Sequence, residues 1–333
     1  MKRLIIVVFT FTVILFSGCT QNKQTVTVYT SVDRVFSEPV LKKFEKETGI
    51  KVKALYDTEE TKSTGVVNRI IAEKNNPQCD VFWSGDPVRV VVLKKKGLTQ
   101  AFSVKNSEGI SNIFRDPENH WVGFSARARV IIFNKKKLGE RPIPKSIFDF
   151  TKPEYKNDFA IANPLFGTTT FHIAALFSLL GNTKAETLIN KWKANGMKIV
   201  ASNGDVKSRV LKGEIACGLT DTDDAFEAKK ESEDVDFVFP DQNGIGTLIM
   251  PNAVVLIKNS PHTETAIKLI NYLLSPETEE MLAKSCAQMP LHKGVSVPRD
   301  VPSLDKIVPM NIDYEKTADK LIEIKDYLKT IAE

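Results

Sequence analysis

The sequence predicts an α/β fold made of two lobes, each built around a parallel sheet. Short apolar runs alternate with helix-period patterns along the chain, and the second half repeats this alternation with different loops. Length agrees, because 315 residues remain once residues 1–18 are set aside as a leader, and two ordinary domains need about that many. Ligands of parallel sheets bind beyond the carboxyl ends of the strands, so we expect the site in those loops.

The first nineteen residues resemble a bacterial lipoprotein signal. Lys2 and Arg3 precede a mainly apolar run at residues 4–16, which is short for a permanent membrane span. Ser17 and Gly18 then precede Cys19, as in a lipobox, although Phe16 stands where leucine is more common. We therefore expect residues 1–18 to be a signal peptide, Cys19 to be lipidated, and residues 19–24 to form a tether. The alternative is an ordinary secretory peptide with an incidental Cys19.

Charge and cysteine content exclude some classes of partner and site. Without Lys2 and Arg3 the chain has 44 Lys and Arg against 41 Asp and Glu, and its lysines are scattered without interleaved aromatic residues. This pattern does not indicate nucleic-acid binding. Cys79, Cys217 and Cys286 are odd in number and lie beside apolar residues. We expect buried free thiols rather than a disulfide framework or a zinc site.

The first half predicts strand, helix, strand, helix, strand. Strands are expected at residues 25–29, 50–55 and 80–83, the first helix is expected to stop at Gly49, and the second is expected to be capped by Thr61 or Ser63. Trp83 shares a face with Val81, which favours the core, but it also stands at a strand end. The candidate ligand-binding residues at these strand ends are Ser31, Asp57, Glu59, Thr64, Trp83 and Ser84.

The second half predicts two further strand ends that bear polar groups. A strand at residues 158–162 leads through a polar loop, residues 163–170, into an apolar helix at residues 171–180. Hydroxyl and amide groups at a helix N-terminus suit an anion or a polar ligand, which makes Asn163, Gly167 and Thr168 candidates. Ordinary capping by threonine explains the same segment equally well.

Three carboxylates, Asp221, Asp223 and Asp224, follow a predicted strand at residues 213–219 and precede a predicted helix. One of them is expected to cap that helix and a second to complement its dipole. The third then requires a cation, a basic residue or a ligand hydroxyl.

Six segments in order resemble extracellular solute-binding proteins of the group that contains the bacterial ferric-ion-binding proteins, the capture subunits of ABC importers. They lie at residues 28–31, 41–52, 80–84, 121–130, 218–224 and 288–292. The resemblance implies a class II periplasmic-binding-protein fold with a two-strand hinge, which we place near residues 124–125 and 250–251. Lobe 1 is then expected at residues 25–125 plus 251–295, and lobe 2 at residues 126–250 plus 296–333.

The resemblance fails where ferric-binding relatives have tandem tyrosines, because this chain has Asp223 and Asp224 there. The first loop also lacks the histidine of some relatives, although Tyr29 and Tyr56 are expected near the site. Carboxylates also bind hard cations, so the expected metal ligands are Glu59, Asp221, Asp223 and Asp224. In relatives the region of Arg127 lies near an anion that accompanies the metal, which favours a mixed site or an organic anion equally.

These observations predict a monomeric, lipid-anchored, extracytoplasmic solute-binding protein that delivers its ligand to an ABC permease and has no cofactor of its own. The first ligand hypothesis is ferric iron or another oxygen-ligated metal, with or without an anion. The alternative ligand is a phosphorylated, zwitterionic or polyol organic solute. Two other classes stay open: a metal-dependent extracytoplasmic enzyme that uses the aspartate cluster, and a purely structural lipoprotein.

Overall fold

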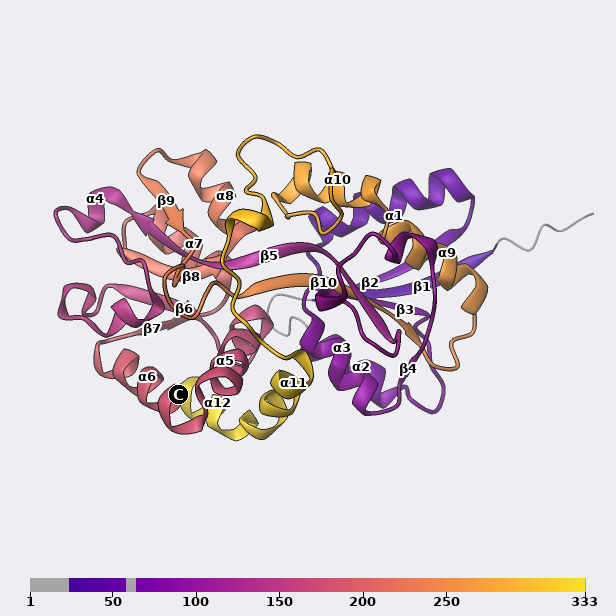
Figure 1. Ribbon diagram of the computed structural model, residues 1–333, viewed down its shortest axis with the longest axis horizontal. Helices are drawn as coiled ribbons and strands as arrows, with labels where there is room; N and C mark the ends of the chain where they lie inside the picture. Colours follow the sequence, from indigo (N-terminus) through magenta and orange to yellow (C-terminus); the bar gives the residue numbers. More distant parts are fainter. Residues whose placement is uncertain (1–23, 58–63, 333) are drawn as a thin grey trace, which may run out of the picture.

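The computed structural model describes residues 24–57 and 64–332, which form two α/β lobes joined by two long strands (Figure 1). In the first lobe three parallel strands have the order β2-β1-β3, followed by antiparallel β10, which also pairs with β4. These strands are β1 Thr25–Thr30, β2 Lys51–Tyr56, β3 Val81–Ser84, β4 Thr99–Gln100 and β10 Ile249–Ile257.

Helices cover both faces of the first lobe's sheet. Val26 and Val28 of β1 face one hydrophobic cluster while Tyr29 faces another, as the period of two in a strand requires. Helices α1, α9 and α10 border the first cluster and α2 and α3 the second. These helices are α1 Arg34–Thr48, α2 Thr64–Ala72, α3 Pro87–Lys95, α9 Thr263–Leu273 and α10 Pro276–Cys286.

The second lobe repeats the parallel arrangement with the strand order β8-β6-β7. The far half of β5 pairs with β8 and β9 in antiparallel register. The strands are β5 Trp121–Asn134, β6 Phe159–Ala162, β7 Lys198–Val200, β8 Cys217–Asp221 and β9 Val235–Val238. The helices are α4 Lys135–Leu138, α5 Gly167–Leu180, α6 Asn182–Ala194, α7 Asn203–Leu211 and α8 Thr222–Glu231.

Strands β5 and β10 connect the lobes, and all fourteen residues of β5 are buried. The first half of β5 pairs with β10, whereas its second half pairs with β8 and β9. The ladder is irregular at the crossing, because Phe124 lies opposite Asn252 and Ala126 opposite Pro251, which leaves Ser125 without a partner. This irregularity coincides with the two predicted hinge positions.

The C-terminal segment contacts both lobes. Helix α11 (Tyr314–Glu323) packs between α3 and α5, and α12 (Lys325–Ala332) follows it (Figure 1, yellow). The Tyr314 ring meets Trp121 at 5.5 Å and Phe171 at 6.4 Å between centroids. Five short 3₁₀ segments complete the described chain: Lys105–Ser107, Asn112–Phe114, Ile147–Thr151, Pro153–Tyr155 and Leu304–Lys306. The helices of the described residues include none long and apolar enough to cross a membrane. The predicted lobe boundaries stay a prediction.

The predicted α/β order is confirmed, with three local corrections. The strand predicted at residues 213–219 is β8, Cys217–Asp221, because Gly213 has φ +67° and the chain turns before the strand begins. The helix predicted at residues 171–180 begins at Gly167, so Thr168 lies in its first turn. Strand β3 includes Ser84. The predicted caps at residues 61 and 63 lie outside the described residues, as does Cys19. The three cysteines at 79, 217 and 286 are free and buried, as predicted.

Candidate functional site

A cavity of about 210 Å³ lies where the strand ends of both lobes meet. The first lobe contributes Ser31 and Asp33 after β1 and Gly85 after β3, and β5 contributes Arg127. The second lobe contributes the loops that follow β6, β7 and β8. Their lining residues are Ala162, Asn163, Phe166, Gly167, Thr168, Thr169, Ala201, Ser202, Asn203, Gly204, Asp221, Asp223 and Asp224. Parallel strands bring these loops to one edge, as the sequence predicted.

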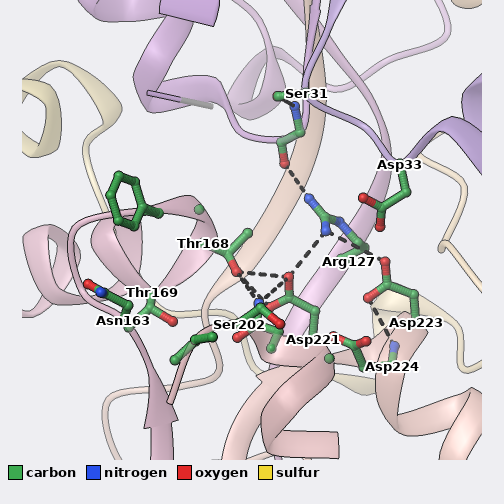
Figure 2. A pocket seen from close by; sticks show the side chains of 17 residues that line it. Ser31, Asp33, Arg127, Asn163, Thr168, Thr169, Ser202, Asp221, Asp223 and Asp224 are labelled. Atoms are coloured by element: carbon green, nitrogen blue, oxygen red, sulfur yellow. Dashed lines mark hydrogen bonds and ion pairs between the residues drawn. The ribbon is translucent and has the colours of Figure 1, made fainter. Parts of the chain in front are cut away.

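Arg127 crosses the cavity from the hinge strand and contacts both lobes. Its Nη2 donates to the carbonyl oxygen of Gly85 at 2.7 Å, and its Nη1 lies 3.1 Å from Asp221 and 3.6 Å from Asp223 (Figure 2). Burial opposes the charge, but the carboxylates of Asp223 and Asp221 outweigh it and raise the pKa of Arg127. A Cβ at Gly85 would lie 2.9 Å from Nη2, so the absence of a side chain there admits the guanidinium.

Asp221 is the centre of a buried polar network rather than a helix cap. It occupies the N-cap position of α8, but its side chain makes no capping bond. Its Oδ1 instead lies 2.6 Å from Nη1 of Arg129, and its Oδ2 accepts from the Thr168 hydroxyl at 2.8 Å. Asn203 donates to the same oxygen at 3.2 Å. Two guanidinium groups, the Thr168 hydroxyl and the Asn203 amide thus occupy both oxygens of Asp221, and its side chain is not available to cap α8.

Asp223 and Asp224, in the first turn of α8, face different partners. Asp223 lies toward Arg127, whereas Asp224 accepts from the Thr220 hydroxyl at 2.9 Å and lies 3.9 Å from Nζ of Lys207. Burial, with the nearby charges of Asp223 and Asp221, raises the pKa of Asp224 to about 8. The cavity thus has a wall rich in carboxylates.

The opposite wall is made of helix N-termini. The first turn of α5 presents Thr168 and Thr169, and α7 begins directly after Ser202, which caps it by accepting from the Asp205 amide at 3.1 Å. The N-cap residue of α5 is Phe166, whose side chain makes no capping bond. Figure 2 shows Asn163, Thr168 and Thr169 on one side of Arg127, and Asp33, Asp223 and Asp224 on the other. Amide and hydroxyl donors at helix N-termini favour anionic groups.

A family model described as "Bacterial extracellular solute-binding protein" matches residues 76–317. The chain belongs to this family. Its members bind solutes and are not enzymes, so the alternative of a metal-dependent enzyme is wrong. The expectation of a two-lobe binding-protein fold is confirmed.

Curated relatives of this solute-binding protein differ in the ligands their names give. It is 27% identical over 309 residues to iron uptake protein A1 of Synechocystis sp., which covers 86% of this chain and 84% of the relative. It is 26% identical over 277 residues to the major ferric iron-binding protein of Neisseria meningitidis, with 81% and 82% covered. It is 26% identical over 257 residues to a putative 2-aminoethylphosphonate-binding periplasmic protein of Salmonella paratyphi A, with 76% and 73% covered.

The overall fold is shared with solved structures of similar proteins. Iron-bound HitA from Pseudomonas aeruginosa superposes with a TM-score of 0.82 at 22% identity, covering 92% of this chain and 99% of that one. AfuA from Actinobacillus pleuropneumoniae, with fructose-6-phosphate, gives a TM-score of 0.81 at 23% identity, covering 92% and 99%. At these identities the likeness establishes the fold of this solute-binding protein alone.

Eight of the predicted ligand-binding residues line the cavity and four do not. Trp83 is fully buried in the first lobe's core, 5.6 Å from the Phe124 ring, because it shares the inward face of β3 with Val81. Ser84 is also fully buried, and its hydroxyl accepts from the Asp86 amide. Asp57 and Thr64 stand outside the lining, and Glu59 lies outside the described residues. Those that line the cavity are Ser31, Arg127, Asn163, Gly167, Thr168, Asp221, Asp223 and Asp224.

Sequence reasoning missed the loop after β7 and the second arginine. Ser202, Asn203 and Gly204 follow a strand of only three residues, whose apolar pattern is too short to be detected. Arg129 is two residues from Arg127 in the sequence, but its burial against Asp221 follows only from the pairing of β5 with β8. The sequence signal for the loop after β7 is the run Ser202-Asn203-Gly204, because serine and asparagine often precede a helix.

Among the described residues, no group of three or more His, Cys, Asp or Glu side chains is arranged to hold a metal ion. Arg127 lies between Asp221 and Asp223, and Arg129 pairs with Asp221 as well, so Asp221 already has two cationic partners. Tyr29 and Tyr56, which were expected near the site, do not line the cavity. The Tyr29 hydroxyl donates to Glu73, and the Tyr56 ring lies under Arg34 at 5.2 Å. The predicted metal set includes Glu59 and stays a prediction.

Proposed function

We propose that this protein is the lipid-anchored capture subunit of an ABC importer and binds a small polar organic solute, one with an anionic group and an amine or hydroxyl group, between its lobes. The observation that supports this ligand class is the two-sided cavity. Helix N-termini with Thr168, Thr169 and Ser202 form one wall, and Asp223 and Asp224 form the other. A solute of this class meets donors at one end and acceptors at the other.

The two arginines do not act as a free clamp for an anion. Arg129 is fully buried and bonded to Asp221, Asn203 and Thr168, and Arg127 lies between Asp221 and Asp223. Because the Thr168 hydroxyl already donates to Asp221, recognition of the anionic end falls to the backbone amides at the starts of α5 and α7 and to the hydroxyls of Thr169 and Ser202. With Asp221 paired with the buried Arg129, the other acidic lining residues, Asp33, Asp223 and Asp224, still outnumber the lining Arg127, which disfavours a purely anionic ligand such as inorganic phosphate.

A zwitterion matches both walls. The relative from Salmonella paratyphi A is named for 2-aminoethylphosphonate, which has a phosphonate at one end and an amine at the other. The amine would neutralise the carboxylate wall, and the phosphonate oxygens would accept from the helix N-termini. This makes the aminophosphonate a suitable first probe for this chain.

Ferric iron or another oxygen-ligated metal is the second candidate, favoured by the carboxylates and by the relatives named for iron. Among the described residues, those that line the cavity include no tyrosine. Any ferric ion bound here would therefore have carboxylate rather than phenolate ligands. Phenolate-to-iron charge transfer gives a strong visible band that carboxylates lack, so the complex would be nearly colourless.

Thermal unfolding with each probe distinguishes the candidates. A ligand present at 100 times its dissociation constant stabilises the native state by about 2.7 kcal/mol, which corresponds to roughly 4 °C in a protein of this size. We expect 2-aminoethylphosphonate to produce such a shift, and inorganic phosphate or ferric citrate to produce little. A shift with ferric citrate and none with phosphorylated or zwitterionic compounds would overturn the proposed ligand class.

Replacing Asp223 tests the carboxylate wall. Loss of one acceptor from a desolvated charged contact costs about 2–5 kcal/mol, so Asp223→Ala should weaken binding of the stabilising probe by more than tenfold. Loss of a helix-dipole interaction alone costs roughly 0.3–1 kcal/mol of stability and leaves the affinity nearly intact. Glu231→Ala, an exposed carboxylate on the same helix, is the matched control. Equal affinities of both variants would limit Asp223 to a role in stabilising α8.

A further inference from the structure

The hinge contains a residue in an unfavourable backbone conformation. Ser125 is fully buried and has φ +42°, in the left-handed region that non-glycine residues seldom adopt. It is the residue that the β5–β10 ladder leaves out between Phe124 and Ala126. Such a conformation persists only where surrounding groups hold it in place.

Hydrogen bonds from three elements hold Ser125 in this conformation. Its amide donates to Oε1 of Glu279 in α10 at 2.7 Å, and its carbonyl accepts from Nδ2 of Asn252 in β10 at 2.7 Å. The next residue, Ala126, exchanges two backbone bonds with Met289, at 2.7 and 2.8 Å. The segment that follows α10 is thereby tied to the hinge strand.

Glu279 is the buried carboxylate at the centre of this arrangement. It is fully buried, and every partner it has among the described residues is a donor. Besides Ser125, it accepts from the amides of Leu291 at 2.8 Å and His292 at 2.9 Å, and it lies 2.8 Å from Nδ1 of His292. Its two oxygens thus face three backbone amides and one imidazole.

His292 supplies the opposite charge. Its Nδ1 faces the Glu279 carboxylate and its Nε2 faces the carbonyl oxygen of Asn106 at 3.0 Å. A neutral imidazole has one N–H, so one of these two acceptors would face a lone pair. Both contacts are satisfied only by the imidazolium. The ring also lies on the backbone of Gly109, where a Cβ would approach it to 2.4 Å, so its position is closely defined.

We propose that Glu279 and His292 are positioning residues that form a buried ion pair, which holds the hinge bulge at Ser125 and thereby sets how β5 crosses between the lobes. Neither residue lines the cavity, so this role is independent of the class of ligand. The pair links α10, β5 and the Asn106 turn, and any closure that rotates the backbone at Ser125 acts against its hydrogen bonds.

The pair makes the hinge sensitive to rising pH. The hydrogen bond to Glu279 is the largest cause that raises the pKa of His292 above its usual value; burial opposes it. The other charged group of α10 that favours the imidazolium is Glu277. From the facing side, Arg115 donates to the carbonyl of Ser107 at 3.1 Å, next to the Asn106 turn. Because the folded pKa is raised, the stabilisation is present below the usual pKa and is lost as pH rises through the folded value.

Nitrogen NMR of the histidine side chains in the full ligand-free protein tests the charge. At pH 6.5, near its ordinary pKa, the His292 ring should be doubly protonated in more than half of the molecules, with a titration midpoint above the ordinary value of about 6.5. His292→Gln identifies the signal among the four histidines. A midpoint at or below about 6.5 would overturn the proposal.

Amide hydrogen exchange tests the link to the hinge. In Glu279→Gln the Ser125 amide should exchange at least about tenfold faster and the His292 midpoint should fall by about one pH unit or more. Glu277→Gln, the same change at an exposed position two residues away, should alter Ser125 exchange little and lower the midpoint less. Equal effects of the two variants would refute the link. If Glu279→Gln does not fold, the wild-type protein provides the test. The protection of the Ser125 amide, corrected for intrinsic exchange, should fall as pH rises through the His292 midpoint. Constant protection would refute the link.

Discussion

Replacing Asp224 by asparagine should stabilise the ligand-free protein at alkaline pH. Burial and the charges of Asp223 and Asp221 raise the pKa of Asp224 to about 8, whereas an unfolded chain has a value near 3.8. The folded state therefore binds more protons than the unfolded state between these values. Stability falls as pH rises through this window, and the loss is complete above the folded pKa.

The size of the stabilisation follows from the difference between the folded and unfolded pKa values of Asp224. The full difference corresponds to an upper limit of roughly 5–6 kcal/mol at high pH, at about 1.36 kcal/mol for each pH unit. About 20% of the Asp224 side chain is exposed, and Lys207 lies 3.9 Å away, so solvent and this cation reduce the cost. We expect Asp224→Asn to gain about 1–3 kcal/mol at pH 8.5. The Thr220 hydroxyl can still donate to the asparagine oxygen.

Urea unfolding at pH 5, 7 and 8.5 measures this effect. The variant and the wild type should be closest at pH 5, and the variant should be the more stable at pH 8.5. Glu231→Gln, an exposed carboxylate on the same helix, controls for the general effect of removing a negative charge. If the wild type and Asp224→Asn lose stability in parallel from pH 5 to 8.5, Asp224 is ionised at no cost and the reasoning is refuted.

Four further predictions test other parts of the molecule. Cys19→Ser should leave an unprocessed precursor that incorporates no labelled palmitate; equal labelling of wild type and variant would exclude Cys19 as the anchor. Asp221→Ala should cost about 3–5 kcal/mol in urea unfolding, because it leaves the fully buried Arg129 without its carboxylate and Arg127 with Asp223 alone, and a loss below about 1 kcal/mol would contradict this pairing. Gly85→Ala places a Cβ 2.9 Å from Arg127 Nη2 and should lower affinity for the stabilising probe at least about tenfold; unchanged calorimetric affinity would show that Arg127 adjusts freely. Saturating probe should reduce the radius of gyration in small-angle scattering, and an unchanged value would argue against closure.

Local patterns in the sequence determined most of the fold. The alternation of apolar residues in β1 and the αL glycine at Gly49 that ends α1 depend on neighbouring residues, so they were predicted correctly. The placement of polar strand ends along one edge follows from parallel order, and it brought Asn163, Thr168 and Asp221 into the site. The errors lie where the apolar pattern of a strand continues beyond the strand itself. Residues 213–216, which were predicted as strand, precede β8.

Tertiary structure decided the chemistry of the site. The spacing of the aspartates suggested a cap and a metal site, but the pairing of β5 with β8 sets Arg129 against Asp221, and no local signal contains that contact. In the same way the strand pattern favours the core for Trp83 but leaves the cleft open, and the packing of Phe124 against it places it in the core. The hinge shows the same division, because Ser125 and Glu279 are 154 residues apart in the chain and their bond exists only once α10 lies against β5. A sequence specifies which groups are available at each strand end, whereas long-range pairing determines which of their charges are already neutralised.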